Sequence, residues 1–580
     1  MSDYDLVLLH APSVYDFRQE AILYGPVADF VPAPFVFETY PLGYTALVEY
    51  LERGGYRVHL MNLAAHMLDV PDFDAEAAIA TLNPIAFVID FHWLAHAQGA
   101  LAVAQIVKTF HPETPVILGG SAATYFHREL VDYPQVDYVL RGDSTEDPLL
   151  RLMECLSLGR IPDLVPGLTW RTRSGRVVEN PLGPPLASLD SLTFGYEQCW
   201  LPLSHTHRVD YTVAIGMMAR GCTQNCLTCG SSAYAYRRLH GRQKPGYRSP
   251  ELLARDLRDV RRYHTVPVCV PGDITQAGMD YAYRFLQAVR GFPDLVFLDL
   301  FGPVPRKFLR DVADALPHFA LQISMGSHDT AVRQAMGKSH SNEALEQTIA
   351  DALSLGCERL DLHFAIGLPR QDYDSVMATV AYCDDLLIRF SNRGILRGVG
   401  RLQPFIAPVA PFLDPGSLVF GEPQPAGYRL LFHSLEEHRQ ALLAPSWKYV
   451  LNYETEWMTR DDIVRATYDA TAAMARLRAK HNLIPSDYAQ ELEKQVDQAY
   501  QLMAEIDRAL ALNDTDRFQD TLRALKPRID EVNRAGLCDR HLISSKGIVT
   551  RRPVGSGRAL RSTRKVWLFF RDWWRRWNGY

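Results

Sequence analysis

The sequence has no long apolar run and few cysteines. Its 580 residues contain no window of about 20 uninterrupted apolar residues, so no membrane-spanning helix is predicted. Residues 1–17 lack the basic start and the long apolar stretch of a signal peptide, and we therefore expect a cytoplasmic protein. Nine cysteines are too sparse for a disulfide scaffold, which excludes the small disulfide-rich secreted classes.

Neither sign of charge dominates the whole chain. The 61 Lys and Arg residues stand against 67 Asp and Glu residues, and the 37 Gly and 36 Pro residues exclude collagenous and low-complexity classes. The basic residues are nevertheless uneven, because Lys546 to Tyr580 holds ten of them and a single acid. This segment carries a net charge of +9, which leaves −15 on the rest of the chain.

The first part of the chain alternates short apolar runs with helical segments. Strands are predicted at residues 5–10, 56–63, 85–90, 115–118 and 136–140, and helices at residues 42–54 and 98–110. Continuous apolar strands that alternate with helices are typical of a doubly wound parallel sheet covered on both faces. The fold class is therefore α/β, and ligands are expected beyond the carboxyl ends of the strands.

Small and hydroxylated residues follow the predicted strands at this edge. They are Gly43, Gly119, Gly120, Ser121, Thr124, Gly142 and Asp143. Glycines let the backbone approach a large ligand closely and hydroxyls donate hydrogen bonds, although ordinary turns also explain these glycines. The arrangement resembles the cobalamin-binding domain that precedes a radical-SAM domain, over residues 1 to about 180. The resemblance implies that these residues contact cobalamin.

The signature Asp-x-His-x-x-Gly, whose histidine ligates cobalt, is absent after the first predicted strand. Asp90 and His92 come close to it but follow the third strand. His92 and His96 lie four residues apart and are more simply explained as packed or solvated histidines than as a ligand pair. The resemblance therefore implies cobalamin bound base-off, without a histidine ligand.

Three cysteines carry the strongest chemical signal. Cys222, Cys226 and Cys229 have the spacing Cys-x3-Cys-x2-Cys and follow a strand-like run at residues 211–218. Thiolates are soft ligands that suit iron–sulfur clusters, zinc or Cu(I). A structural zinc site normally uses a second cysteine pair, and the sequence contains none. A structural zinc site or a set of free thiols remains the alternative.

The cysteine spacing and the downstream strands resemble the radical S-adenosylmethionine (SAM) superfamily. The resemblance implies a 4Fe-4S cluster with one iron open for SAM, in a partial (β/α)6 barrel. The implied SAM contacts follow successive strands and are Gly272, Asp273, Gln322, Ser324, Gly367 and Gln403. Two residues depart from the family pattern: Gly326 stands where Glu is frequent, and Thr228 where an aromatic residue is common.

Together the two resemblances imply a cobalamin-dependent radical SAM enzyme, most simply a methyltransferase acting on an unactivated carbon through a 5'-deoxyadenosyl radical. Radical cyclisation or rearrangement with the same cofactors is the first alternative, and a non-catalytic corrinoid or iron–sulfur sensor is the second. The chemistry requires a reducing partner such as flavodoxin or ferredoxin. The expected substrate is a small or lipid-like molecule, and no nucleic acid is expected.

The predicted organisation has five parts. They are a cobalamin-binding domain (1–182), a linker (183–206), a radical SAM barrel (207–420), a helical region (421–540) and a basic aromatic tail (541–580). In the tail, apolar residues recur at three- and four-residue steps with arginines toward the other side, which is typical of a helix lying on anionic lipid. A docked terminal helix or a disordered tail touching nucleic acid are the alternatives. The expected location is therefore cytoplasmic, at the inner face of a membrane.

Overall fold

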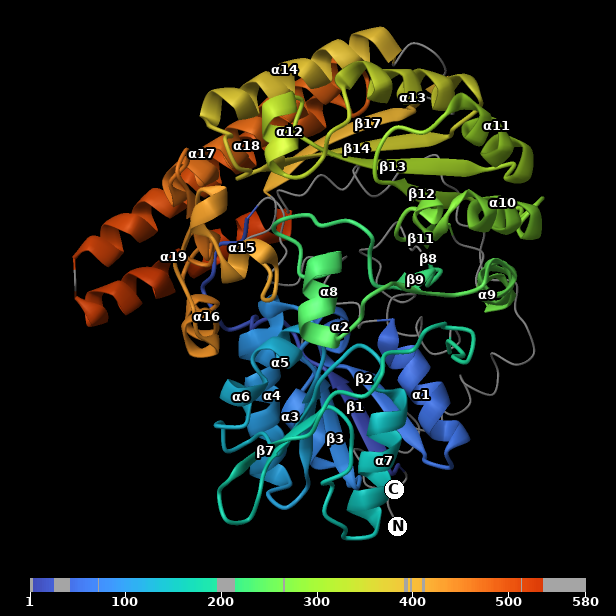
Figure 1. Ribbon diagram of the computed structural model, residues 1–580. Helices are drawn as coiled ribbons and strands as arrows, with labels where there is room; N and C mark the ends of the chain where they lie inside the picture. The colour runs from blue at the N-terminus through green and yellow to red at the C-terminus, as the bar shows by residue number, and fades with distance from the viewer. Residues whose placement is uncertain are drawn as a thin grey trace, which may run out of the picture.

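The computed structural model describes residues 4–25, 42–70, 72–195, 214–263, 267–390, 395–396, 399–408, 413–512 and 514–535. The predicted tail, residues 541–580, and residues 196–206 of the predicted linker lie outside these ranges, so their predictions stay predictions. Within the described ranges, no helix is long and apolar enough to cross a membrane. Two sheets with their helices lie one above the other in Figure 1, and a helical region lies at one side.

The N-terminal sheet has seven strands in the order β2-β1-β3-β4-β5-β6-β7. Their bounds are β1 Leu6–His10, β2 Val58–Asn62, β3 Ala86–Asp90, β4 Val116–Gly119, β5 Tyr138–Leu140, β6 Leu168–Arg171 and β7 Val177–Glu179. The first five strands pair in parallel, as the continuous apolar runs predict. The last two pair antiparallel and extend one edge of the sheet. The strand order reverses between β1 and β3, which is where doubly wound sheets open a crevice for ligands.

Helices bury both faces of this sheet. On one face, α1 (Gly43–Arg53) and α7 (Glu146–Ser157) pack leucines such as Leu51 and Leu152 against the strands. On the other face lie α2 Leu63–Asp69, α3 Ala75–Ala80, α4 Ala97–Phe110, α5 Ser121–Tyr125 and α6 His127–Leu130. The predicted two-sided cover is therefore confirmed.

The second sheet has six parallel strands in the order β17-β14-β13-β12-β11-β8. Their bounds are β8 Ala214–Ile215, β11 Val268–Val270, β12 Val296–Leu300, β13 Phe319–Gly326, β14 Arg359–Ile366 and β17 Leu402–Pro408. β8 and β17 form the two edges of this order, so the barrel stays open. The helices of its outer side are α9 Pro250–Tyr263, α10 Met279–Ala288, α11 Arg306–Ala315, α12 Thr330–Ala335, α13 Asn342–Ser354 and α14 Tyr373–Phe390 (Figure 1). The predicted α/β fold with a partial barrel is confirmed.

The C-terminal region forms hydrogen bonds with the segment that follows β1. It comprises α15 Leu418–Gly421, α16 Leu435–Ala441, the hairpin of β18 Tyr428–Leu430 and β19 Tyr453–Thr455, α17 Arg460–Lys480, α18 Ser486–Ala511 and α19 Thr515–Ala535. Leu23 exchanges backbone hydrogen bonds with this region, donating to Pro445 O at 2.9 Å and accepting from Trp447 N at 3.0 Å. The side-chain amide of Asn533 on α19 also donates to Ile22 O at 2.8 Å. The helical region therefore connects the first sheet to the barrel.

The described part of the predicted linker is bound along its length. Leu189 N donates to Tyr247 O, in β10 (Gly246–Tyr247), at 3.0 Å. The buried Arg248 guanidinium donates to the carbonyls of Leu189 and Leu192 at 2.7 and 2.8 Å. Arg248 thus satisfies two carbonyl groups of a described segment that forms no helix or strand of its own.

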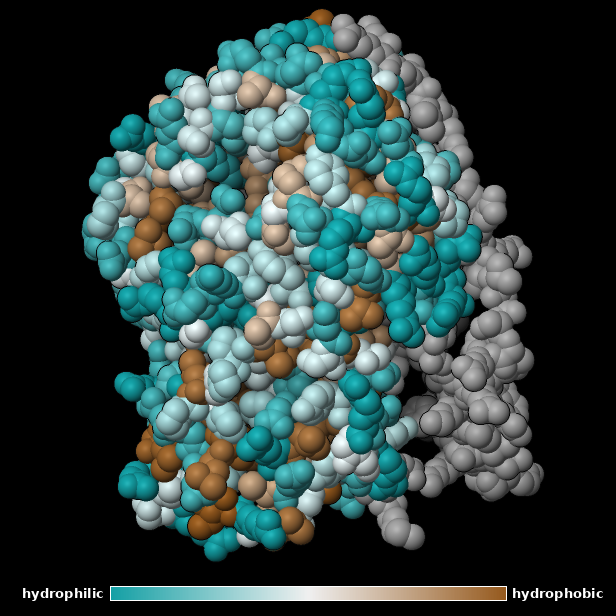
Figure 2. Space-filling model, turned by 45° about the vertical axis from the view of Figure 1, so that its right-hand side comes forward, coloured by the Kyte–Doolittle hydropathy of each residue, from teal (hydrophilic) through white to brown (hydrophobic). Residues whose placement is uncertain are grey.

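The surface carries some exposed apolar residues over the N-terminal domain. In Figure 2 they gather on the lower part of the face shown, where this domain lies. Large apolar side chains exposed in the loop after α7 include Leu158, Ile161 and Leu164. These three side chains are far more exposed than the core leucines of the same domain.

A matched pair of leucine substitutions tests this core. Leu152 on α7 is fully buried, whereas Leu164 is 84% exposed. We expect Leu152→Ala to lower the free energy of unfolding by about 2–5 kcal/mol, because it removes buried methyl groups and leaves a cavity. Leu164→Ala should change it by less than about 0.5 kcal/mol. Urea unfolding followed by circular dichroism measures both, and equal losses would contradict the assigned packing.

Candidate functional site

The three cysteines of the predicted cluster lie on one loop between β9 (Ala219–Arg220) and α8 (Ala233–His240). The backbone amides of Gln224 and Ser231 donate hydrogen bonds to the Sγ atoms of Cys222 and Cys229, both at 3.3 Å. Hydrogen bonds to sulfur are among the features that tune iron–sulfur clusters. The loop therefore offers three thiols, and backbone hydrogen bonds constrain the directions of two of them, Cys222 and Cys229.

The donor set suits an iron–sulfur cluster, because all three side chains are thiols. In the part of the chain that the structure describes, no three His, Cys, Asp or Glu side chains are grouped to hold one metal ion. A 4Fe-4S cluster takes each thiolate on a different iron atom, so its ligands lie farther apart than those of one ion. Three cysteines on one loop, with no fourth ligand, leave one iron open.

Two of the three thiols, those of Cys222 and Cys229, lie in surroundings that favour the protonated form. Burial raises the pKa of the Cys229 thiol to about 12, and the nearby Asp414 carboxylate adds to this shift. Burial also raises the pKa of Cys222. Asp414 accepts a hydrogen bond from Gly230 N at 2.9 Å, and burial raises its own pKa to about 6. Metal coordination deprotonates such thiols, so loading of this loop releases protons.

The cysteine loop touches segments that follow three different barrel strands. Thr223 N donates to the side chain of Gln276, after β11, at 3.3 Å. Gly230 reaches Asp414, after β17, and Gly337, after β13, faces Asn225 O. The carboxyl ends of parallel strands lie at one edge of a sheet, so the loop lies over the edge at which barrel enzymes place their sites.

Two rows of side chains, most of them polar, run across neighbouring strands of the second sheet. Strand register aligns Asp299, Gln322, Asp361 and Gln403 across four neighbouring strands. Two residues farther along, Ser324, His363 and Phe405 form a second row. The rings of His363 and Phe405 stack with centroids 5.2 Å apart. Ser324 and His363 are exposed although both lie on central strands, so this face of the sheet is open to a ligand.

Asp273, a predicted SAM contact, has both carboxylate oxygens engaged within the protein. One accepts hydrogen bonds from the backbone and hydroxyl of Thr275, at 2.8 and 2.6 Å. The other accepts from Phe301 N at 2.9 Å. The side chain therefore braces two neighbouring loops. Gly272, which is also a predicted SAM contact, precedes Asp273 in the loop after β11 and has φ +86°.

Asp299 is a candidate site residue that the sequence reasoning missed. One of its oxygens accepts a hydrogen bond from Gly272 N at 2.9 Å, and the other is buried without a hydrogen-bond partner. Burial, together with the charge of Asp273, raises the pKa of Asp299 to about 6. The sequence feature that could have indicated Asp299 is a single acidic residue inside the apolar run VFLDL.

The other predicted SAM contacts lie on or near the open face of the second sheet. Gly367, at φ +90°, donates its N–H to the Gln371 side chain at 2.9 Å, and its carbonyl accepts from Tyr428 Oη at 2.9 Å. The Gln403 side chain accepts from Arg478 on α17 at 2.9 Å. The C-terminal region thus supports this part of the site. Sequence reasoning missed Tyr428 and Arg478 because both lie far along the chain from their partners.

Ser324 is joined to a lysine beside the cysteine loop. Lys338 Nζ donates to the carbonyl oxygen of Ser324. Burial lowers the pKa of Lys338, and the neighbouring Cys226 opposes this shift. Lys338 therefore lies between the cysteine loop and the open face of the sheet.

The predicted cobalamin contacts gather at the carboxyl edge of the first sheet. The Thr124 hydroxyl donates to Gly120 O at 2.7 Å and accepts from Gly142 N at 3.1 Å, which joins the loops after β4 and β5. Gly119 ends β4, and Ser121 begins α5. Gly43 begins α1, and the position of a Cβ atom there meets no atom within 4 Å.

The structure gives a reason for a glycine at position 120 that differs from the expected close approach to a ligand. Its φ is +119°, and a Cβ atom would lie 2.7 Å from the Cα of His92. The close approach is therefore to the protein's own backbone after β3, and a side chain here would displace that segment. Nothing in this geometry concerns a ligand directly.

Buried histidines lie at the strand-order reversal. His10, at the end of β1, is hydrogen-bonded through Nδ1 to the carboxylate of Asp90, at the end of β3, at 2.8 Å. His96 is fully buried, and its ring centroid lies 5.0 Å from that of His10. His92 packs edge-on against Trp93, and burial lowers the pKa of His92. His96 thus has the packed role that the sequence favoured.

Two arginines from the barrel join the first sheet to the cysteine loop. Arg220, in β9, forms an ion pair with Glu146 at 2.5 Å and donates to the carbonyl oxygen of Asp143 at 2.6 Å. The Arg242 guanidinium donates to both carboxylate oxygens of Asp143 and to Leu186 O at 2.7 Å. We call these four residues, Arg220, Arg242, Asp143 and Glu146, the arginine clamp. Asp143, a predicted cobalamin contact, therefore binds an arginine with both oxygens.

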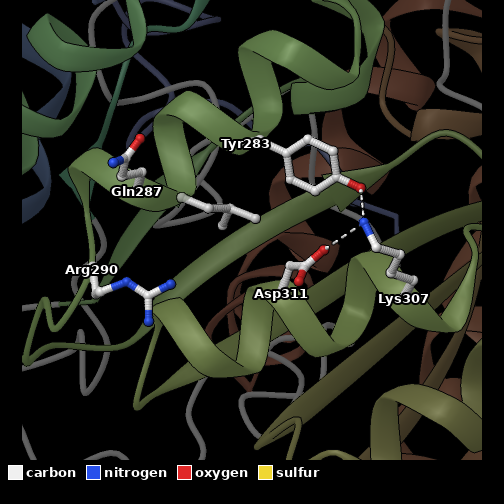
Figure 3. Close-up of a pocket in the computed structure, with 6 residues that line it drawn as sticks. Tyr283, Gln287, Arg290, Lys307 and Asp311 are labelled. Atoms are coloured by element: carbon white, nitrogen blue, oxygen red, sulfur yellow. Dashed lines mark hydrogen bonds and ion pairs between the residues drawn. The ribbon is translucent and has the colours of Figure 1, made fainter.

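A pocket of about 250 Å³ lies elsewhere, on the outer helices α10 and α11. Figure 3 shows Tyr283, Lys307 and Asp311 beside it, with Lys307 Nζ 3.5 Å from Tyr283 Oη and 3.9 Å from the Asp311 carboxylate. None of the predicted site residues lines it, so it is separate from the site built around the cysteine loop.

The chain is similar to several known proteins. A family model described as B12 binding domain matches residues 29–149. Cytidylyl-2-hydroxyethylphosphonate methyltransferase of Streptomyces wedmorensis is 23% identical over 47% of this chain and 58% of its own length. Anaerobic magnesium-protoporphyrin IX monomethyl ester cyclase of Rubrivivax gelatinosus is 27% identical over 32% of this chain and 33% of its own. Hopanoid C-3 methylase of Methylococcus capsulatus is 27% identical over 38% and 40%.

These matches span between 33% and 58% of the relatives' own lengths. Among solved structures, the radical S-adenosylmethionine methyltransferase TsrM from Kitasatospora setae aligns with a TM-score of 0.51. The alignment has 15% identity and covers 73% of this chain and 78% of that one. This likeness concerns the fold.

Substituting one loop cysteine tests the cluster assignment. We expect Cys226→Ala to lose most of the iron and sulfide that the wild-type protein retains after anaerobic reconstitution, because a thiolate ligand is removed. Cys155→Ala is the matched control, since Cys155 lies on α7 as a free cysteine. Iron and acid-labile sulfide assays measure both variants, and unchanged iron in Cys226→Ala would refute the assignment.

The buried Asp299 carboxyl predicts a pH-dependent stability change. Its pKa is raised from 3.8 to about 6, so the folded protein binds this proton more tightly than the unfolded chain does. The protein therefore loses folding stability as the pH rises from about 4 to about 6 and Asp299 ionises. At about pH 7 the buried carboxylate destabilises the fold by its full amount. Asp299→Asn should raise the unfolding midpoint at about pH 7 and change it little at about pH 4.

The exposed Asp280 provides the control for this comparison. Its side chain is 90% exposed on α10, so Asp280→Asn should leave the midpoint nearly unchanged at both pH values. Thermal unfolding of the three proteins measures the effect. An Asp299→Asn midpoint that follows the wild type at both pH values would contradict the raised pKa.

Proposed function

Because the chain belongs to the family of radical SAM proteins with a B12-binding domain, we propose that it is a cobalamin-dependent methyltransferase acting on an unactivated carbon. One observation carries the proposal. The arginine clamp holds the cysteine loop of the barrel against the carboxyl edge of the B12-type sheet, so both cofactor-binding edges meet at one place. A sensor would not require this close approach of two edges.

Each part of the proposed site has residues suited to one cofactor. Cys222, Cys226 and Cys229 would hold the 4Fe-4S cluster, and the face of the second sheet on which Ser324 and His363 are exposed would hold SAM. The loops at residues 119–124 and 142–146 would hold cobalamin. When bound, the cluster supplies the electron that cleaves SAM into a radical, and cobalamin supplies the methyl group.

The protein's own residues would position these groups and exclude water. The helix α8, which follows the cysteine loop in the chain, lies between the two sheets in Figure 1. Lys338, bound to the Ser324 carbonyl, brings a cation beside the site where an anionic group of SAM would lie. Asp414 lies next to Cys229 and accepts from Gly230, so it holds the end of the cysteine loop in place.

Methylation is preferred because the relative that matches the largest share of this chain among those reported above, at 47%, is described as a methyltransferase, and a further relative is described as a methylase. Cyclisation is the second candidate, favoured by the cyclase relative at 27% identity. The substrate is proposed as a small or lipid-like molecule. A flavodoxin or ferredoxin is proposed as the electron donor, since the cluster needs an external reductant.

Isotope labelling distinguishes these candidates. The reconstituted protein would be incubated anaerobically with cobalamin, a strong reductant, methyl-deuterated SAM and extract of the native cells. We expect 5'-deoxyadenosine together with a product that carries the deuterated methyl group. Cys226→Ala is the control and should form neither. Formation of 5'-deoxyadenosine with an unlabelled, cyclised product would favour the cyclase, and absence of 5'-deoxyadenosine would refute the proposed function.

A further inference from the structure

The arginine clamp connects segments that would carry two different cofactors. Arg220 lies two residues before Cys222, and Arg242 follows α8, so the clamp holds both flanks of the cysteine loop. Both arginines meet the same short segment after β5, which begins at Gly142. A displacement of the cysteine loop therefore acts directly on this segment.

The clamp is buried, which makes its geometry difficult to change. The side chains of Arg242 and Asp143 are 2% and 9% exposed, and those of Arg220 and Glu146 are 11% and 3% exposed. Separating a buried ion pair leaves a charge without compensation at a cost of several kcal/mol. Each guanidinium also donates to a carbonyl oxygen, so rotation would break further hydrogen bonds. The clamp therefore holds the two loops in one fixed relation to each other.

The segment after β5 is in turn joined to the neighbouring loop of the first sheet. Gly142 N donates to Thr124 Oγ1 at 3.1 Å, and Thr124 Oγ1 donates to Gly120 O at 2.7 Å. Ser144 Oγ accepts from Leu186 N at 3.0 Å, which adds the segment that leads into the barrel. A continuous set of hydrogen bonds thus runs from the flanks of the cysteine loop to the predicted cobalamin loops.

We propose that Arg220 and Arg242 are positioning residues that make binding of the cluster and of cobalamin cooperative. This inference rests on the proposed function. Cluster assembly fixes the position of the cysteine loop, the clamp transmits that position to the loop after β5, and cobalamin then meets a loop whose position is already set. By thermodynamic linkage, cobalamin strengthens cluster retention by the same factor.

The coupling is measured as a ratio of two cobalamin affinities. The dissociation constant of hydroxocobalamin is determined anaerobically for the full-length protein with and without the reconstituted cluster. We expect about tenfold tighter binding to the cluster-loaded wild type, within the usual range of coupling between sites. In Arg242→Gln the ratio should fall toward one, because the charged link to Asp143 is lost.

Two further variants keep the test decisive. Arg128→Gln breaks an ion pair with Glu179 in the same domain, where Arg128 is 75% exposed, and it should keep the wild-type ratio. Glu146→Gln breaks the Arg220 pair while the Arg242 pair stays, so an intermediate ratio is expected. If Arg242→Gln does not fold, Glu146→Gln decides the result. A wild-type ratio of one, or equal ratios in wild type and the clamp variants, would overturn the proposal.

A spectroscopic signature separates positioning from a general loss of structure. In the protein loaded with cob(II)alamin and the reduced cluster, the magnetic interaction between the two centres depends on their separation. We expect the electron paramagnetic resonance splitting to change in Arg242→Gln and to return largely in Arg242→Lys, which keeps the charge. An unchanged splitting in Arg242→Gln would contradict positioning. Failure of the wild type to bind either cofactor would instead refute the proposed function.

Discussion

Buried pairing between arginines of the barrel and acids of the first sheet is the constraint on which the site depends. A charge removed from water is tolerated only with a well-placed partner, so Arg242 and Asp143 must stay together whenever both are buried. The pair holds the two sheets with their ligand-binding edges toward one another. Because the cysteine loop begins two residues after Arg220, the same constraint places the thiols at this meeting point.

Much of the fold could be predicted from local patterns. The apolar runs at β1, β3 and β4 are continuous because these strands are buried on both faces, and that pattern is visible without a structure. The antiparallel strands β6 and β7 escaped prediction because they are short and only partly buried. The contacts of the linker could not be predicted either, since the Arg248 that donates to the carbonyls of Leu189 and Leu192 lies more than fifty residues along the chain.

Part of the candidate site could likewise be predicted from local sequence patterns, and part of it could not. Cys222, Cys226 and Cys229 could be found because their spacing within one loop carries the chemical information. Asp143 was singled out as a ligand contact, yet its carboxylate binds Arg242, which is 99 residues away in the sequence. No local pattern reveals such a partner. Asp273 is similar, because its position was evident from the strand pattern while its hydrogen bonds to Thr275 and Phe301 depend on how two loops meet.

The central claim is that one chain binds an iron–sulfur cluster and cobalamin at the meeting point of its two sheets. Elemental analysis tests this most directly, on full-length protein produced with cobalamin and reconstituted anaerobically. The account predicts about four iron atoms and one cobalt atom per chain, as a 4Fe-4S cluster and one corrinoid require. One zinc atom per chain with neither iron nor cobalt would contradict it.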